Sequence, residues 1–402
     1  MTVASGADGA VPASHHAQMR WALMFGNFVI GCGIMVVPGT LNDLSRSLPV
    51  SVALAGQLFA IGAATVCFGA PLLAGWVAAF DRRKLHTVSL VGYAVGHALC
   101  AAMPSYSALL PIRAVTMLGA AVFTPQAAAA VGFMSPPEHR GRAITFIFLG
   151  WSMASVLGLP LSAWLGDTFG WRFAFVAVAA IALIAAGWVH AVMPGRVRPA
   201  ALSLAAWKRA FSSPLLMAIV GVTFLTGAGQ FTLFSYFTPY FRDVLHASTV
   251  QSSLLLVWFG VFGLLGNLML TRFIDRVGTH VAGTAMVCFI AITFIAITFI
   301  AWPFVAGMIA TAVALVPWAF GCFSGQSAQQ ARFSAVAPAL APALMALNTS
   351  AIYLGQAAGG SSGGWLIAHQ GYASLSTAGL VWLIVAIAVS VWAARVAMRA
   401  AR

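Results

Sequence analysis

Long apolar stretches alternate along this chain with short breaks that hold charged residues, prolines or clusters of glycine. The hydrocarbon core of a bilayer is about 30 Å thick, and roughly 20 helical residues cross it. The breaks leave twelve apolar stretches of about this length, which predict twelve transmembrane helices. Their expected ranges are 21–43, 52–80, 85–103, 106–133, 142–166, 172–193, 214–241, 250–273, 279–301, 303–328, 341–367 and 373–396. The ninth and tenth helices divide one long apolar run, which we expect to turn back at Trp302 and Pro303.

The composition indicates that lipid, rather than water, surrounds most of the molecule. Of 402 residues, 61% are apolar and only 7% are Asp, Glu, Lys or Arg, against about 25% charged residues in a soluble domain. The five cysteines lie in apolar runs without a C-x-x-C spacing, so we expect them to be buried, and we expect no metal site and no cofactor. The first 19 residues lack the apolar core of a signal peptide, so the first apolar segment should stay in the mature protein.

The basic residues predict how the chain is oriented in the membrane. The formal charge is +13, but residues 281–331 hold no charged side chain, which excludes a continuous basic face for nucleic acid. Short cytoplasmic loops collect Lys and Arg. With the N-terminus inside, only Arg46, Arg172 and Arg242 of the 20 basic residues lie in outside loops, Arg113 lies within a span, and the other sixteen lie inside. We therefore expect a multi-pass protein of the bacterial inner membrane with both termini in the cytoplasm.

The predicted helices form two halves of six. We expect a cytoplasmic tail over 1–20, a six-helix half over 21–193, a cytoplasmic linker over 194–213, a second six-helix half over 214–397 and a final tail over 398–402. In the linker, the spacing of Leu204, Trp207 and Phe211 fits a short helix on the membrane surface, and a plain basic loop fits nearly as well.

Residues of the two halves correspond at an offset of roughly 195 residues, as expected for a repeat. The matching positions are Asp81 with Asp275, Gly158 with Gly355, Gly166 with Gly363, and Gly170 with Gly371. Repeats of this size are typical of transporters that bind substrate between the repeats, near the midplane of the membrane.

Four stretches carry a family resemblance. The loop after the second predicted helix reads GWVAAFDRRKL, with a second copy at Asp275-Arg276-Val277-Gly278, the fourth helix reads LPIRAVTMLGAA, and the fifth reads GWSMASVLGLPLSAWLGDTFGWRFAF. These resemble signatures of the major facilitator superfamily, and of its arabinose-efflux-permease-like branch of drug:proton antiporters, over about residues 21–394. The resemblance implies an all-α membrane protein with twelve transmembrane helices in two pseudo-symmetric halves.

The resemblance also implies a gate and a moving helix. A carboxylate at a helix end that faces basic residues can form a charge lock that closes one side, although the same charges could serve topology alone. The gating candidates are Asp81, Arg82, Arg83, Asp275, Arg276, Gly158 and Pro160. The small residues of the fifth helix suit close packing against the first. The first copy of the loop signature departs from the family pattern, since Ala79 stands at its usual Asp.

Acidic residues are missing where a proton relay would need them. All seven acids, Asp8, Asp43, Asp81, Glu138, Asp167, Asp243 and Asp275, fall away from the predicted mid-membrane region. Relatives often place a Glu in the first helix, where this chain has Ile34. The coupling candidates are therefore Asp43, His97 and Arg113. Alternatively, Asp43 caps the loop beside Arg46, His97 is a packed histidine, and Arg113 extends to the outer interface.

The resemblance places the first, fourth, seventh and tenth helices around the centre of the bundle. Candidates for the substrate cavity are Asn27, Gln57, Arg113, Gln230, Tyr236, Trp318, Asn348, Tyr353 and Gln356. Apart from Arg113 these are amides and aromatics, which suit neutral or amphipathic molecules. Each could equally form a hydrogen bond between helices.

These features predict a secondary transporter that exports small organic solutes, drug-like, sugar-like or nucleoside-like, by alternating access and proton antiport. The alternative is a proton-independent facilitator or importer of a small organic anion, since no central carboxylate is found. An intramembrane enzyme would need catalytic side chains clustered within the spans, and none are seen. The expected partners are the solute, protons and the lipid bilayer, with the protein a monomer.

Overall fold

The residues that the structure describes form helices and the short turns between them. The computed structural model describes residues 13–50, 52–195, 204–237, 240–241, 244–299 and 308–400. The long helices are α1 (Ala13–Gly39), α3 (Val52–Val77), α4 (Arg82–Ala102), α5 (Tyr106–Met134), α6 (Arg140–Met153), α7 (Leu159–Phe169), α8 (Trp171–Val192), α10 (Pro214–Phe234), α12 (Thr249–Val277), α13 (Thr279–Phe299), α15 (Met308–Val336), α16 (Ala341–Gln370) and α17 (Ala373–Ala400). The short elements are α2 (Leu41–Ser47), α9 (Leu204–Ser212), the π-helical turn η2 (Ala154–Gly158), and the 3-10 turns η1 (Pro137–His139) and η3 (Pro338–Leu340).

The predicted spans agree with these helices. Because α6, η2 and α7 are continuous, the described ranges hold twelve long helical segments, at the positions of the twelve predicted spans. Eleven of these are long and apolar enough to cross a membrane. The remaining one, α16, is equally long but less apolar, because it holds Asn348, Gln356 and several glycines.

Several helix ends differ from the predicted ends, and the tenth span continues to Val336 instead of ending at residue 328. The first span ends at Gly39, directly after Pro38, and the chain continues as the separate helix α2. The seventh ends at Phe234 rather than at residue 241, because the chain turns at Ser235. The expected break at Trp302 and Pro303 lies outside the described residues. The helices on either side of it, α13 and α15, pack against each other.

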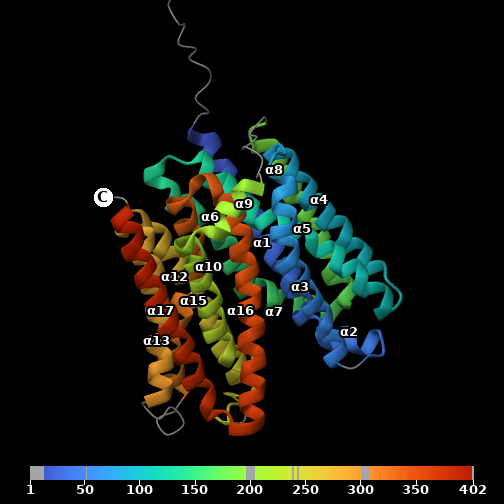
Figure 1. Cartoon of the computed structure of the whole chain (residues 1–402). Helices are drawn as coiled ribbons and strands as arrows, with labels where there is room; N and C mark the ends of the chain where they lie inside the picture. Colours follow the sequence, from blue (N-terminus) through green and yellow to red (C-terminus); the bar gives the residue numbers. More distant parts are fainter. Residues whose placement is uncertain are drawn as a thin grey trace, which may run out of the picture.

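The helices are arranged as two halves that lie side by side (Figure 1). One half contains α1 to α8 and the other contains α10 to α17. They meet where α3 and α5 pack on α16, and where α6 packs on α12 and α15. We call the end of the bundle where α1 begins and α17 ends the terminal face, and the other end the opposite face. The short helix α9 also lies at the terminal face (Figure 1).

Glycines permit the closest helix pairs. A side chain at Gly150 of α6 would collide with the carbonyl oxygen of Met24 in α1. At Gly158, about two turns further on, an added Cβ would lie 3.2 Å from the Sγ of Cys32. In the second half, Gly359 of α16 faces the backbone of α10 in the same way. The close packing predicted for the fifth helix against the first is therefore present, and it recurs in the other half.

The helix that contains Gly158 changes its winding at this contact. Residues Ala154–Gly158 form a π-helical turn directly before Leu159 and Pro160. Proline offers no backbone N–H to the preceding turn, so the regular α-helical hydrogen-bond ladder cannot continue there. Turns of this kind inside α-helices are frequent at functional sites.

The linker forms a short helix, as one of the two interpretations of its sequence predicted. Leu204 and Phe211 of α9 are exposed, while the ring of Trp207 stacks on that of Phe211 with centroids 5.9 Å apart. The alanines on the other side of α9 are buried. The helix therefore has an apolar exposed side of the kind that lies on a membrane surface.

Candidate functional site

A charged side chain lies inside the first half, on α5. Arg113 is 1% exposed, so the interpretation in which it extends to the outer interface is wrong. Its Nη2 donates a hydrogen bond to the carbonyl oxygen of Gly33 at 2.8 Å, and its Nη1 lies 3.2 Å from the Nε2 of His97. The guanidinium also lies 5.9 Å from the centre of the Phe175 ring. All these partners are electrically neutral when His97 is unprotonated.

The contacts of His97 determine its tautomer. Its Nδ1 lies 2.9 Å from the carbonyl oxygen of Tyr93, which can only accept, so Nδ1 carries a proton. Its Nε2 lies 3.2 Å from the Nη1 of Arg113 and 3.4 Å from the carbonyl oxygen of Gly33. Because a guanidinium can only donate, we assign Nε2 as the acceptor in the shorter contact and His97 as neutral. The sequence suggested Arg113 and His97 as alternative coupling residues, whereas the structure joins them in one hydrogen-bonded pair.

The pairing has a simple geometric cause. The helices α4 and α5 are antiparallel neighbours joined by a short turn at Met103 to Ser105. His97 and Arg113 lie at similar distances before and after this turn, so they reach the same depth in the bundle. This spacing was available in the sequence and was the signal that could have paired them.

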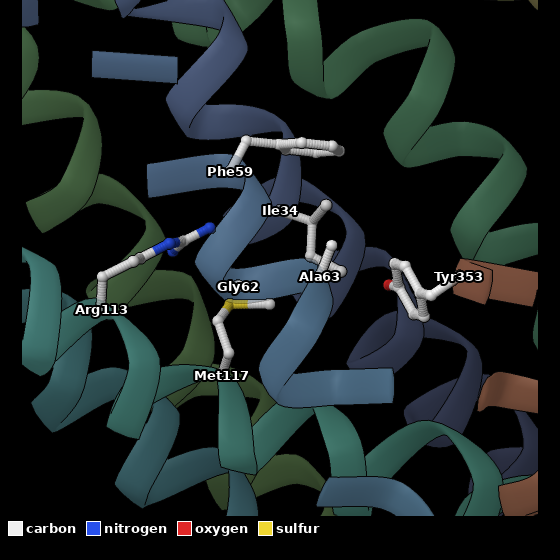
Figure 2. A pocket seen from close by; sticks show the side chains of 7 residues that line it. All are labelled: Ile34, Phe59, Gly62, Ala63, Arg113, Met117 and Tyr353. Carbon is white, nitrogen blue, oxygen red and sulfur yellow. The ribbon is translucent and has the colours of Figure 1, made fainter. Parts of the chain in front are cut away.

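The Arg113 side chain lines a small pocket between the two halves (Figure 2). The lining residues come from α1, α3, α5 and α16, and are Ile34, Phe59, Gly62, Ala63, Arg113, Met117 and Tyr353. Among them only Tyr353 belongs to the second half, and its ring faces the pocket from the side opposite Arg113 (Figure 2). The pocket is otherwise apolar, so it combines one cation and one phenol with an apolar wall.

The Nε–H of Arg113 has no hydrogen-bond partner among the described residues, although the atom is buried. It faces the space beside Gly62, where an added Cβ would lie 3.8 Å from Nε and 3.1 Å from the Cγ of Met117. A side chain at position 62 would therefore crowd Met117 and reach the unpaired Nε of Arg113.

No carboxylate of the described residues joins this site. Asp43, a predicted coupling residue, accepts a hydrogen bond from the backbone N–H of Trp171 at 2.6 Å and thereby caps the start of α8. The structure thus favours the capping interpretation of Asp43, although the cap is on α8 rather than on the loop beside Arg46. Asp8 and Asp243 lie outside the described residues. Within the described ranges, no three His, Cys, Asp or Glu side chains gather as metal ligands would.

Most other predicted cavity residues hold helices together within one half. Asn27 donates to the carbonyl oxygen of Ile147 and accepts from Thr124. Elsewhere Gln230 accepts from Trp318, Asn348 accepts from Thr223, and Tyr236 donates to the carbonyl oxygen of Gly360. Gln57 is exposed and Gln356 is half-buried. Of the nine predicted cavity residues, Arg113 and Tyr353 line the pocket described above.

The apolar lining was not predicted. Ile34, Phe59, Ala63 and Met117 carry no chemical signal in a chain that is 61% apolar. Ile34 was singled out because relatives often have a Glu there. The structure places Ile34 in the pocket wall, on the same pocket as Arg113.

The halves are joined near the terminal face by the second loop signature. Asp275 of α12 accepts a hydrogen bond from the backbone N–H of Arg142, in the first turn of α6, at 3.1 Å. In the same region Arg140 donates to the carbonyl oxygens of Gly132, at 2.8 Å, and of Ser334 in the second half, at 3.5 Å.

The hydrogen bonds of Asp81 and Arg82 in the first loop signature stay within the first half. Asp81 accepts from the backbone N–H of Lys84 and caps α4, and Arg82 is buried against the side chain of Gln126. Arg83 is half-buried and Arg276 is exposed. The expected equivalence of Asp81 and Asp275 therefore does not hold in structure, because Asp81 precedes α4 whereas Asp275 lies in the last turn of α12.

Two further contacts join the halves at equivalent positions of the repeat. Asn267 of α12 donates to the hydroxyl of Ser152 in α6 at 3.1 Å. Ser350 of α16 donates to the carbonyl oxygen of Cys67 in α3, and the Cys67 thiol lies 3.7 Å from the carbonyl oxygen of Ser350. The two contacts are buried, and each pairs a serine of one half with a residue of the other.

Comparison with known proteins agrees with this architecture. A family model described as Major Facilitator Superfamily matches residues 23–360. The inner membrane transport protein YdhP of Escherichia coli (strain K12) is 27% identical over 368 residues, covering 90% of this chain and 92% of that protein. A chloramphenicol resistance protein of Streptomyces lividans is 30% identical over 260 residues, covering 64% of this chain and 66% of that protein.

Solved structures share the fold. The human organic anion transporter MFSD10 superposes with a TM-score of 0.76 at 15% identity, covering 94% of this chain and 100% of that chain. The proton:xylose symporter XylE superposes with a TM-score of 0.72 at 16% identity, covering 94% of this chain and 95% of that chain.

Proposed function

Because this chain belongs to the Major Facilitator Superfamily and is a membrane transporter of small solutes, we propose that it exports small organic solutes by alternating access. The observation that carries the proposal is a pocket lined by both halves, through Arg113 on one side and Tyr353 on the other. A solute bound between two halves is released to whichever face they open toward. The contacts made by Asp275 and Arg140 hold the halves together near the terminal face, which supports release at the opposite face.

The proposal includes an orientation. The terminal face is cytoplasmic, with both termini and the linker over 194–213 on that side of the bacterial inner membrane. The support is the distribution of the 20 basic residues, of which three fall in loops on the other side. The tails over 1–20 and 398–402 and the halves over 21–193 and 214–397 follow from the same scheme, and the transporter acts as a monomer.

Export, rather than import, is supported by two features. One relative is a chloramphenicol resistance protein, 30% identical over 260 residues. The fifth span has the glycines and the proline of the antiporter signature, and Gly158 packs against α1 at the π-helical turn before Pro160. The solutes are drug-like, sugar-like or nucleoside-like molecules, whose mixture of apolar surface and few polar groups matches the residues that line the pocket.

Two sources of energy are compatible with export. In proton antiport, the coupling residues would be His97 and Arg113. Asp43 is a weaker candidate, because it accepts a hydrogen bond from the backbone N–H of Trp171 at the start of α8. The second candidate is proton-independent movement of an organic anion. It is favoured by the neutral partners of Arg113, which leave the positive charge of the pocket unbalanced among the described residues.

The test is a panel of solutes assayed for accumulation in cells that carry or lack the protein. We expect at least one solute to accumulate less in carrying cells, and Arg113→Ala to abolish this difference at equal membrane abundance. The matched control is Arg172→Ala, which removes an exposed arginine outside the pocket. Proton antiport predicts that export stops when the pH gradient alone is collapsed. Equal accumulation in both cell types for the whole panel would contradict export.

A further inference from the structure

The pocket is a cationic site without a counter-charge among the described residues. The guanidinium of Arg113 keeps its proton in proteins, and both of its hydrogen-bond acceptors, the carbonyl of Gly33 and the neutral ring of His97, carry no net charge. A charged side chain at this depth in a membrane protein is expensive unless it is paired. The arrangement thus favours any ligand that brings one negative charge.

The free donor shows where that charge would lie. The Nε–H of Arg113 is buried and has no partner among the described residues, and Nε lies near Gly62, whose missing side chain would come within 3.8 Å of it. Across the pocket stands the phenol of Tyr353, a second O–H donor, whose ring faces Arg113 in Figure 2. Two donors on opposite walls suit a group with several acceptor oxygens, such as a carboxylate or a sulfonate.

The other residues that line the pocket determine which chemical groups the rest of the ligand can have. Ile34, Phe59, Ala63 and Met117 present only apolar atoms. An apolar or aromatic body gains from contact with them, whereas a second charged group would lose its hydration without a partner. A cation would in addition be repelled by Arg113.

We propose that the pocket binds a monoanionic, amphipathic organic acid, whose anionic oxygens accept from Arg113 and Tyr353 and whose apolar body lies against α1 and α3. The proposal rests on the proposed function and names the substrate class of the same site. Because Tyr353 belongs to the second half and the other lining residues to the first, the ligand touches both halves. It can therefore favour one arrangement of the halves over another.

A monoanionic substrate also supplies a driving force. The cytoplasmic side of a bacterial membrane is electrically negative, so outward movement of one negative charge is favoured by about fifty-fold for each 100 mV of potential. A proton on His97 would strengthen anion binding, since it adds positive charge beside Arg113. Proton and anion would then move together without net charge, so the membrane potential drives only the anion that is bound while His97 is neutral. Export driven by the membrane potential needs no proton carrier in the centre, and no carboxylate of the described residues lines the pocket.

The experiment uses three probes of one shape and different charge. These are 2-naphthalenesulfonate, 2-naphthalenesulfonamide and trimethyl(2-naphthyl)ammonium, and binding to the purified full-length protein is measured by calorimetry. We expect the sulfonate to bind at least tenfold more tightly than the sulfonamide, and the ammonium compound not to bind. In proteoliposomes, an interior-negative potassium diffusion potential should accelerate sulfonate efflux, and an imposed pH gradient at zero potential should not.

Variants assign the effect to the two donors. Arg113→Gln should abolish sulfonate binding, and Arg113→Lys should weaken it because lysine keeps the charge but lacks the Nε–H. Tyr353→Phe removes one hydrogen bond and should weaken binding about fivefold. The matched controls are Tyr106→Phe, whose hydroxyl bonds the carbonyl of Leu54 outside the pocket, and Arg172→Gln. If Arg113→Gln does not fold, the other two variants still decide the question.

Several results would overturn this inference. They are equal or tighter binding of the sulfonamide or the ammonium compound, no binding of the sulfonate, or sulfonate affinity unchanged in Arg113→Lys and Tyr353→Phe. In any of these cases, export of a neutral or cationic solute in the cell assay would leave the proposed function standing. Absence of export for the whole panel would instead remove the function on which the inference rests.

Discussion

At the scale of single residues, the pair of His97 and Arg113 is the main polar feature of the first half. Arg113 uses His97 as an acceptor, so the histidine fixes the orientation of the guanidinium toward the pocket. His97 is in turn oriented by its Nδ1–H, which donates to the carbonyl oxygen of Tyr93. In this arrangement His97 is a positioning residue, and its acceptor nitrogen matters more than its ability to take up a proton.

This role makes a prediction about two substitutions. The side-chain oxygen of glutamine can still accept from Arg113, so His97→Gln should keep most transport and most thermal stability. His97→Leu leaves a buried N–H of a charged group unpaired, which should cost about 1.5–3 kcal/mol of unfolding free energy and most of the transport. Thermal unfolding in detergent and flux in proteoliposomes check both. A stable His97→Gln protein without transport would instead make His97 a proton carrier.

Single residues were only partly predictable from the sequence. Arg113 stood out because an arginine within a span is rare, and it does line the pocket. Asp43 was ambiguous, because the N–H that it caps belongs to Trp171, 128 residues further along the chain. The two amides Asn27 and Gln230 were candidates for the cavity on chemical grounds. Their actual partners are groups on neighbouring helices, which no local pattern reveals.

At the scale of elements, the contact of α1 with α6 and η2 depends on two glycines that tolerate change differently. An added Cβ at Gly150 meets the backbone carbonyl of Met24, which cannot move without separating the helices. At Gly158 it meets the Sγ of Cys32 at 3.2 Å, a side-chain atom that can shift. Gly150→Ala should therefore lose most of the folded protein, and Gly158→Ala should not. Size-exclusion profiles of both variants in detergent check this, and equal yields would contradict it.

Substitution of Gly158 by leucine, which is larger than alanine, distinguishes an effect on folding from an effect on transport. A leucine side chain at position 158 would collide with α1 if α1 and the helix that contains Gly158 slid past each other. Gly158→Leu should therefore lower transport more than membrane abundance, with Gly158→Ala as its control. Normal flux in Gly158→Leu would show that this contact does not move.

Helix positions were predictable because a span must bury about 20 residues in lipid, whatever its partners are. Helix ends were harder to predict, since they depend on local turns. The short break at Thr40 separates the apolar α1 from α2, whose sequence LNDLSRS is mostly polar. The π-helical turn before Pro160 likewise has no signature beyond the proline itself.

At the scale of the whole molecule, orientation can be tested by labelling. In a cysteine-free background, Lys208→Cys on α9 and Ser107→Cys at the start of α5 place exposed thiols at the terminal and opposite faces. A membrane-impermeant maleimide added to intact cells should label position 107 and spare position 208 until the cells are opened. The reverse pattern would invert the proposed orientation and with it the direction of export.

The central claim is that the two halves must separate near the terminal face during each transport cycle. Ser350 of α16 and Cys67 of α3 touch across the boundary between the halves, so Ser350→Cys places a second thiol beside the native one. Flux of a transported solute should be measured in proteoliposomes before oxidation, after oxidation and after reduction, with Ser350→Cys in a Cys67→Ala background as the control. The account predicts that flux stops when the disulfide forms and returns when it is reduced, in the paired variant only. Undiminished flux with the disulfide fully formed would contradict alternating access through this boundary.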